Sequence, residues 1–215
     1  MNRRTVIATI ALLSVGAFVA GAVFYQPGNG EPPAPSPADS NDAPLVRPHA
    51  PVLGPSNAPV TIVEFLDPAC EACRAFYPIV KRIMAQYPDK VRVVVRYAAF
   101  HPTSEEAIRI LEAARLQDKF EPVLERLFET QLRWAPHGRP ADSAWTVLEG
   151  TGLNIEKARV DAMMPDIVGM MNTDANDVKA VGVNKTPTFF VNGKPLPEFG
   201  AQQLLDLVKA EVASN

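Results

Sequence analysis

The sequence is poor in cysteine and has no concentration of positive charge. Only two of its 215 residues are cysteines, Cys70 and Cys73. With no third cysteine, a framework of structural disulfides is excluded, and the pair is reactive, metal-binding or incidental. No basic cluster follows Arg3 and Arg4, and the formal net charge is −3. Binding to a phosphate backbone needs such a cluster, so we expect no nucleic-acid partner.

Charged residues are also missing from Val6 to Tyr25, directly after Asn2-Arg3-Arg4. Ala20-Gly21-Ala22 has the small residues of a signal-peptidase site, which favours a cleaved export signal. The apolar run is also close to the ~20 residues that span a bilayer, so a retained anchor is the alternative. We interpret residues 1–25 as a signal peptide or signal anchor. The functional domain is then expected in the periplasm or at the extracytoplasmic face of the inner membrane, where disulfides persist.

Residues 26–55 contain nine prolines among Gly, Ala, Ser and Asp. This composition is unsuited to a buried core and predicts an extended, mobile linker. Because such a linker is a poor dimerisation module, we expect a monomer, tethered to the membrane if the anchor is retained. The folded domain is predicted to cover residues 56–215.

The folded domain begins with an α/β pattern. Val60–Leu66 and Val91–Tyr97 are apolar runs typical of buried strands. Between them Phe76, Val80 and Ile83 recur at the spacing of one helix face. A strand, a helix and a strand in this order predict a parallel unit.

A helical block, a hairpin and a last helix complete the pattern. The block covers about residues 103–178, with one of its short helices expected at Asp142–Glu149. Thr188–Val191 then has the composition of a strand, and Asn192-Gly193 is a strong signal for a hairpin turn. Ala201–Val212 has the amphipathic pattern of a closing helix.

Both cysteines lie at the start of the first predicted helix, in the segment Asp67-Pro68-Ala69-Cys70-Glu71-Ala72-Cys73. Positions three apart are neighbours on a helix, so the two sulfurs share its first turn. Free N–H groups and the positive end of the helix dipole favour a thiolate there, and the thiolate is the reactive form of cysteine. A C-x-x-C beside a strand–helix–strand pattern is typical of a thioredoxin-like redox motif.

Three further features accompany this motif. Glu64 precedes the cysteines within the first strand, Pro78 lies inside the following helix, and Gly182–Gly193 contains a Thr-Pro pair before a strand. With them, the chain from about Pro59 onward resembles the thioredoxin-fold disulfide oxidoreductases of the DsbA type. That family often carries a buried acid, a helix-kinking proline and a cis-proline segment at these places.

The resemblance implies an α/β thioredoxin fold in which residues 103–178 form an inserted helical domain. It also implies a cis bond between Thr186 and Pro187, packed against the cysteines, with the Thr186 backbone free to pair with a substrate strand as in β-augmentation. DsbA itself has a different dipeptide between its cysteines, so Glu71-Ala72 leaves the redox role open.

The position of each cysteine predicts its role. We expect Cys70 to be the exposed nucleophile at the helix tip and Cys73, one turn deeper, to be the resolving thiol. Arg74 is expected to lower the pKa of Cys70, and Glu71 to oppose that effect. Glu64 has apolar neighbours on both sides and is expected to be buried with a raised pKa. It then carries protons for Cys73, or it forms an ion pair with Arg96 of the adjacent strand.

These features predict an extracytoplasmic thiol–disulfide oxidoreductase that acts on cysteine-containing exported proteins. No organic cofactor is needed, because Cys70 and Cys73 carry the two electrons, and a membrane redox partner is expected to reset the pair. The direction of exchange stays open. Two alternatives remain: a membrane-tethered chaperone that binds peptides, and a copper-handling protein that uses the cysteines with a group of methionines, namely Met163, Met164, Met170 and Met171.

The three histidines give no support for a metal centre. His49, His101 and His137 are scattered, and none has ligand spacing to the cysteines, so no metal site is expected. His101 is interpreted as a loop histidine without a special role. Trp134 and Trp145 are expected to pack within the helical block.

Overall fold

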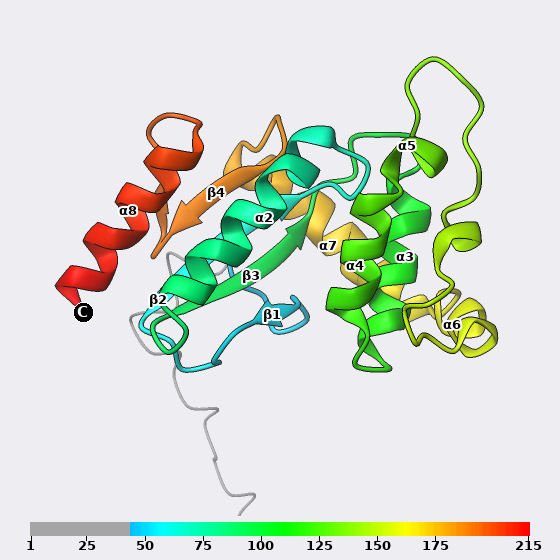
Figure 1. Ribbon diagram of the computed structural model, residues 1–215, viewed down its shortest axis with the longest axis horizontal. Coiled ribbons are helices and arrows are strands. Elements are labelled where there is room, and N and C mark those ends of the chain that lie inside the picture. Colours follow the sequence, from blue (N-terminus) through cyan, green and yellow to red (C-terminus); the bar gives the residue numbers. More distant parts are fainter. Residues whose placement is uncertain (1–43) are drawn as a thin grey trace, which may run out of the picture. The chain divides into compact units, whose positions relative to one another are not determined.

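The computed structural model describes residues 44–215, and its centre is a five-stranded sheet in the order β1-β3-β2-β4-β5 (Figure 1). β2 (Val60–Leu66) and β3 (Val91–Tyr97) pair in parallel along their whole length. β4 (Thr188–Val191) pairs antiparallel with β2 and turns at Asn192-Gly193 into β5 (Lys194–Pro195). The predicted α/β class and the positions of the three longer strands are confirmed. Predictions for residues 1–43 lie outside the described residues.

Helices cover both faces of the sheet (Figure 1). α2 (Glu71–Gln86) and α8 (Ala201–Ser214) contact each other and one face, where Ile62 and Val93 belong to the larger apolar core. α7 (Pro165–Val181) packs on the opposite face. Because successive residues of a strand point to opposite faces, strands covered on both sides are apolar throughout, as β2 and β3 nearly are.

The segment between β3 and β4 forms the predicted helical insertion. Its apolar centre includes Trp134, whose indole Nε1–H donates to the Leu127 carbonyl at 2.8 Å. The predicted helix at Asp142–Glu149 is only a short 3₁₀ turn, and the insertion ends at Gly182, whose positive φ closes α7. The remaining elements are α3 (Ser104–Arg115), α4 (Phe120–Glu129), α5 (Gln131–Trp134), η1 (Ala144–Val147) and α6 (Ile155–Asp161).

The predicted linker is wrong from Pro44 onward, because residues 44–53 belong to the folded domain. We call them the N-terminal strap. Leu45 and Ala50 are buried in the core beneath α7, and β1 (Val52–Leu53) pairs antiparallel with β3. The strap contributes only one strand of two residues, at the edge of the sheet, where prolines are tolerated. Its proline-rich composition therefore resembles that of a linker although it is folded.

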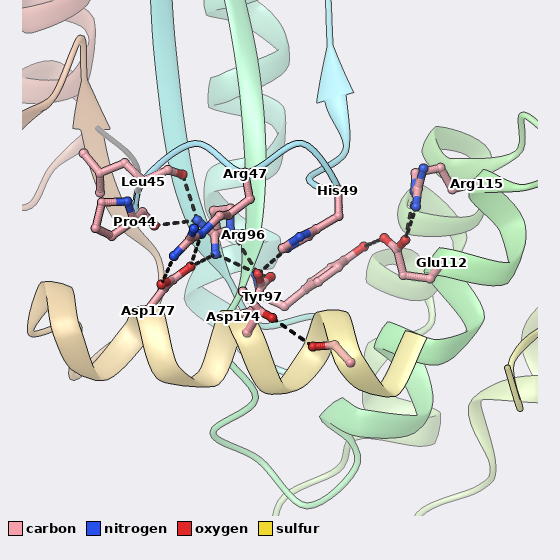
Figure 2. A network of polar contacts seen from close by, with 12 residues as sticks. Pro44, Leu45, Arg47, His49, Arg96, Tyr97, Glu112, Arg115, Asp174 and Asp177 are labelled. Carbon is pink, nitrogen blue, oxygen red and sulfur yellow. Dashed lines mark hydrogen bonds and ion pairs between the residues drawn. The ribbon is translucent and has the colours of Figure 1, made fainter. Parts of the chain in front are cut away.

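Arg96 of β3 anchors the strap through a buried polar network (Figure 2). Its guanidinium donates to the carbonyl oxygens of Pro44 and Leu45, at 2.5 and 3.0 Å. It also pairs with Asp174 and Asp177 of α7, at 2.7 and 2.6 Å. The network therefore joins three segments of the chain: the strap, β3 and α7.

Two side chains of the strap contact the same two carboxylates. Arg47 contacts Asp177 at 2.7 Å, and the His49 Nε2 contacts Asp174 at 2.7 Å (Figure 2). Together with Arg96 and the Tyr97 backbone N–H, these side chains satisfy both carboxylates, as buried charges require.

The alternative pairing of Glu64 with Arg96 is wrong. In the parallel ladder Glu64 lies opposite Val95, and Arg96 lies opposite Phe65. Neighbours across a ladder share a face, so Glu64 and Arg96 point to opposite faces of the sheet.

Candidate active site

The cysteines lie where β2 passes into α2, facing the loop that precedes β4. Cys70 is the N-cap residue of α2, with an extended backbone, and its Sγ donates to the Thr186 carbonyl at 3.3 Å. The Thr186–Pro187 peptide bond is cis, as the family resemblance implies. The fold thus brings together Cys70 and the Thr186–Pro187 pair, which are far apart in the sequence.

Cys70 is less accessible than expected. It is 8% exposed, because the Thr186 loop covers its sulfur, whereas Cys73 is fully buried one turn below. Both cysteines are free thiols. The predicted order, with Cys70 outermost, holds, but the predicted open exposure of Cys70 does not.

The environment makes the two thiols very different acids. Hydrogen bonds, the largest of them from the Cys73 side chain, together lower the pKa of Cys70 to about 5 against the effect of burial. The other donors are the Thr186 side chain and the backbone N–H groups of Cys73 and Ala72. Arg74, which was expected to lower this pKa, is not one of these groups. Burial raises the pKa of Cys73 far above its ordinary value, and its hydrogen bond to Cys70 adds to the effect.

Glu64 is buried on the same side of the sheet as Cys73. Burial, and secondly the negative charge of Cys70, raise the pKa of the Glu64 carboxyl to about 8. Among the described residues its Oε1 has no hydrogen-bond partner. The charge of Glu64 in turn raises the pKa of Cys73. The carboxyl is thus coupled to both sulfurs and can exchange a proton near neutral pH, and its proton-transfer role stays a prediction.

Asp67 is a site residue that the sequence analysis missed. It directly follows β2 and is fully buried, and its backbone N–H donates to the Cys73 Sγ at 3.4 Å. Its carboxylate accepts hydrogen bonds from Ala69 N at 2.9 Å, from His101 Nδ1 at 2.7 Å, and from two further donors, Phe100 N and Ser104 Oγ. The available signal was a carboxylate directly after a buried strand and before the C-x-x-C.

Gln131 of α5 is the second missed residue. Its side chain is buried, and the Nε2 donates to the carbonyl oxygens of Pro68, at 2.8 Å, and Cys70, at 3.1 Å. The helical insertion thereby supports the backbone just before α2. Only the tertiary fold brings α5 to this place, so no local pattern could have identified it.

A family model with the description "Thioredoxin" matches residues 47–210. The chain belongs to the thioredoxin family. It is similar to a thioredoxin-like oxidoreductase from Silicibacter pomeroyi, with 27% identity and a TM-score of 0.67, over 81% of this chain and 98% of that one. The α-DsbA1 of Wolbachia pipientis has the same fold, with a TM-score of 0.70 at 16% identity, over 81% of this chain and 96% of that one. These findings confirm the predicted DsbA-like thioredoxin fold.

A different similarity is found among curated proteins. The Na(+)/H(+) antiporter NhaA of Herminiimonas arsenicoxydans is 31% identical over 145 residues, which are 67% of this thioredoxin-family chain and 22% of the antiporter. The chain spans about a quarter of the length of the curated relatives it matches. From Pro44 to Asn215, no helix combines the length and apolar character needed to cross a membrane.

The described residues give little support to the alternative that the protein handles copper. Met170 packs in the core, whereas Met163 and Met164 are exposed between α6 and α7. Within residues 44–215 no group of three or more His, Cys, Asp or Glu side chains is arranged as a metal site.

Proposed function

We propose that this thioredoxin-family protein is an extracytoplasmic thiol–disulfide oxidoreductase that exchanges disulfides with exported proteins through Cys70 and Cys73. The observation that carries the proposal is the position of Cys70. It caps α2 beside the cis Thr186–Pro187 bond, with the second thiol one turn below it. A lowered pKa makes Cys70 a thiolate at neutral pH, which is the attacking form.

The exchange proceeds in two balanced steps. The Cys70 thiolate attacks one sulfur of a substrate disulfide, forming a mixed disulfide and releasing the other substrate sulfur as a thiolate. Cys73 then loses its proton and attacks the Cys70 sulfur, which forms the Cys70–Cys73 disulfide and releases the second substrate thiolate. The substrate gains two electrons and the protein loses two; the reverse sequence oxidises a substrate dithiol.

Glu64 supplies the proton acceptor in this scheme. The Cys73 thiol is buried and does not ionise by itself near neutral pH, since its pKa is far above the ordinary value. A carboxyl with a pKa of about 8 exchanges protons efficiently at the working pH. We therefore assign proton transfer at Cys73 to Glu64.

Substrate binding uses the loop next to Cys70. The Thr186 backbone offers an edge for an extended substrate segment, in the manner of β-augmentation. Phe199 is 49% exposed and stacks on Phe76 of α2, with ring centroids 4.6 Å apart. Because Phe76 is one turn after Cys73, this apolar surface is available to residues that flank a substrate cysteine. A membrane redox partner recycles the pair, and the protein acts as a monomer.

The test is a trapping experiment with the purified protein and an oxidised protein substrate. Cys73→Ser is expected to accumulate a mixed disulfide through Cys70, detected as a covalent adduct that dithiothreitol releases. Cys70→Ser is the matched control and is expected to form no adduct and to lose all exchange. If Cys73→Ser forms no adduct while peptide binding survives in Cys70→Ser, the chaperone alternative replaces the proposal.

The direction of exchange follows from two measurements. A high reduction potential together with a mainly oxidised pair in cells indicates a disulfide donor, and a low potential with a reduced pair indicates a reductase.

A further inference from the structure

The cation that accompanies a reactive thiolate is not found between the two cysteines. Those positions are Glu71 and Ala72. The positive charge near the Cys70 thiolate can therefore come from a side chain of another element. Asp67 and His101 are the candidates, because they connect the loop after β2 with the loop after β3.

The Asp67 side chain is fully engaged in hydrogen bonds. Each of its two oxygens accepts two of them, four in all. One of the donors, Ser104 Oγ, begins α3, and Ser104 Oγ also accepts from the His101 backbone N–H at 3.3 Å. The His101 ring is thereby fixed at both its backbone and its side chain.

The hydrogen bond to Asp67 determines which nitrogen of His101 carries a proton. Asp67 can only accept, so the His101 Nδ1 is the protonated nitrogen in the neutral ring, and the Nε2 takes the second proton. The His101 side chain is 30% exposed and lines a cavity of about 190 Å³ together with Ala69, the neighbour of Cys70. Ala69 N and His101 Nδ1 also donate to the same Asp67 carboxyl, at 2.9 and 2.7 Å, so a charge on His101 lies close to the segment that carries Cys70.

The groups facing His101 mostly favour its charged form. Burial lowers the pKa of His101, but the hydrogen bond and charge of Asp67, with the charges of Cys70 and Glu71, raise it above its ordinary value. Two further basic side chains, His137 and Arg139, line the same cavity; the rings of His137 and His101 are 6.2 Å apart.

Coupling between two charges is mutual. Since the Cys70 thiolate favours protonated His101, protonated His101 favours the Cys70 thiolate by the same free energy, in addition to the hydrogen bonds that are the main causes of the lowered pKa of Cys70. His137 is placed differently: it pairs with Glu71 and its side chain is 66% exposed, so solvent and its own partner reduce its effect on Cys70.

We propose that Asp67 and His101 form a positioning pair that holds a positive charge beside Cys70 and so determines how readily its thiolate forms. Asp67 orients the ring and contacts the Cys73 sulfur through its backbone, and His101 supplies the charge. The inference deepens the proposed function and takes from it only the identity of Cys70 as the nucleophile.

The test measures the pH profile of Cys70 alkylation by iodoacetamide, with the modified residue located by mass spectrometry. In His101→Gln the midpoint is expected to rise by at least about half a pH unit, which is about a threefold loss of thiolate relative to thiol below the midpoint. Because alkylation needs no disulfide substrate, this result stands apart from the trapping experiment: a protein that fails to exchange disulfides can still show the shift.

Further variants distinguish a specific effect of Asp67 and His101 from the effect of any charge near Cys70. His137→Gln removes a histidine from the same cavity and is expected to shift the midpoint less than His101→Gln. Asp67→Asn is expected to shift it, and the double variant Asp67→Asn/His101→Gln to shift it no more than His101→Gln alone, because Asp67 acts on Cys70 through the positive charge that it favours on His101. An unchanged midpoint in His101→Gln, an equal shift in His137→Gln, or additive shifts in the double variant would each overturn the proposal.

Discussion

At the scale of single residues, the site depends on side chains that are stable in an unusual protonation state. Glu64 is the clearest example, since it is buried in an apolar setting with one oxygen unpaired among the described residues. The hydrogen bond between Cys70 and Cys73 moves their pKa values in opposite directions, whereas burial raises both. Such separation of pKa values supports the proposed roles, with Cys70 as the attacking thiol and Cys73 as the resolving thiol.

Glu64→Gln is expected to change the pH dependence of stability. Because the folded-state pKa of Glu64 is about 8 and its ordinary value is 4.5, the native protein loses stability as the pH rises between these values. The variant avoids this loss and is expected to gain up to about 4 kcal/mol over the wild type above pH 8, and little below pH 4.5. Urea unfolding at both ends of the range measures the difference.

The comparison must be between the variant and the wild type, since ionisation of Cys70 affects stability in the opposite sense. Equal stability differences at high and low pH would contradict the burial of an ionisable Glu64. Slower reaction of Cys73 with the mixed disulfide in the same variant supports the proton-transfer role.

At the scale of secondary-structure elements, α7 is held to the sheet by charge as well as by apolar packing. Arg96 is 0% exposed and contacts Asp174 and Asp177 of α7 together with two strap carbonyl oxygens (Figure 2). Arg96→Met is therefore expected to destabilise the fold by about 3–5 kcal/mol, because it removes the buried cation that the two carboxylates share. Urea unfolding measures the loss.

Arg92 of the same strand provides the matched control. It lies nearer the surface, with hydrogen bonds to Thr61 and the Ser56 carbonyl. Arg92→Met is expected to cost about 1 kcal/mol. Similar losses in the two variants would mean that the buried network adds little to stability.

Elements with a strong local pattern were predictable from the sequence. β2, β3 and β4 begin and end where their apolar runs do, and α2 begins at the C-x-x-C as expected. The strap was not predictable from a local pattern. It is held by hydrogen bonds to its carbonyl oxygens and by the packing of isolated side chains such as Leu45, and the partners of both are far away in the sequence. The same reason explains why Asp67 and Gln131 were missed: their partners lie in other elements, and no spacing in the sequence reveals them.

At the scale of the whole molecule, the strap decides where the domain begins. A chain that starts at residue 56, the boundary predicted from composition, lacks β1 and the buried side chains of Leu45 and Leu53. Against a chain that starts at residue 44, it is expected to lose at least about 3 kcal/mol, since each buried leucine contributes about 1.5–3 kcal/mol. Urea midpoints of the two purified chains measure the loss; equal midpoints would show that the strap packs without stabilising the domain.

The hydrogen bond between Cys70 and Thr186 joins residues 116 positions apart, and the whole helical insertion lies between them. A chain that emerges from its N-terminus presents both thiols long before the loop that covers them has been made. Until α7 has packed and β4 has joined the sheet, Cys70 and Cys73 belong to an unfinished protein whose sulfurs are open to any oxidant or thiol nearby. Cys70 and Cys73 are therefore themselves open to thiol–disulfide exchange before the domain that uses them has folded.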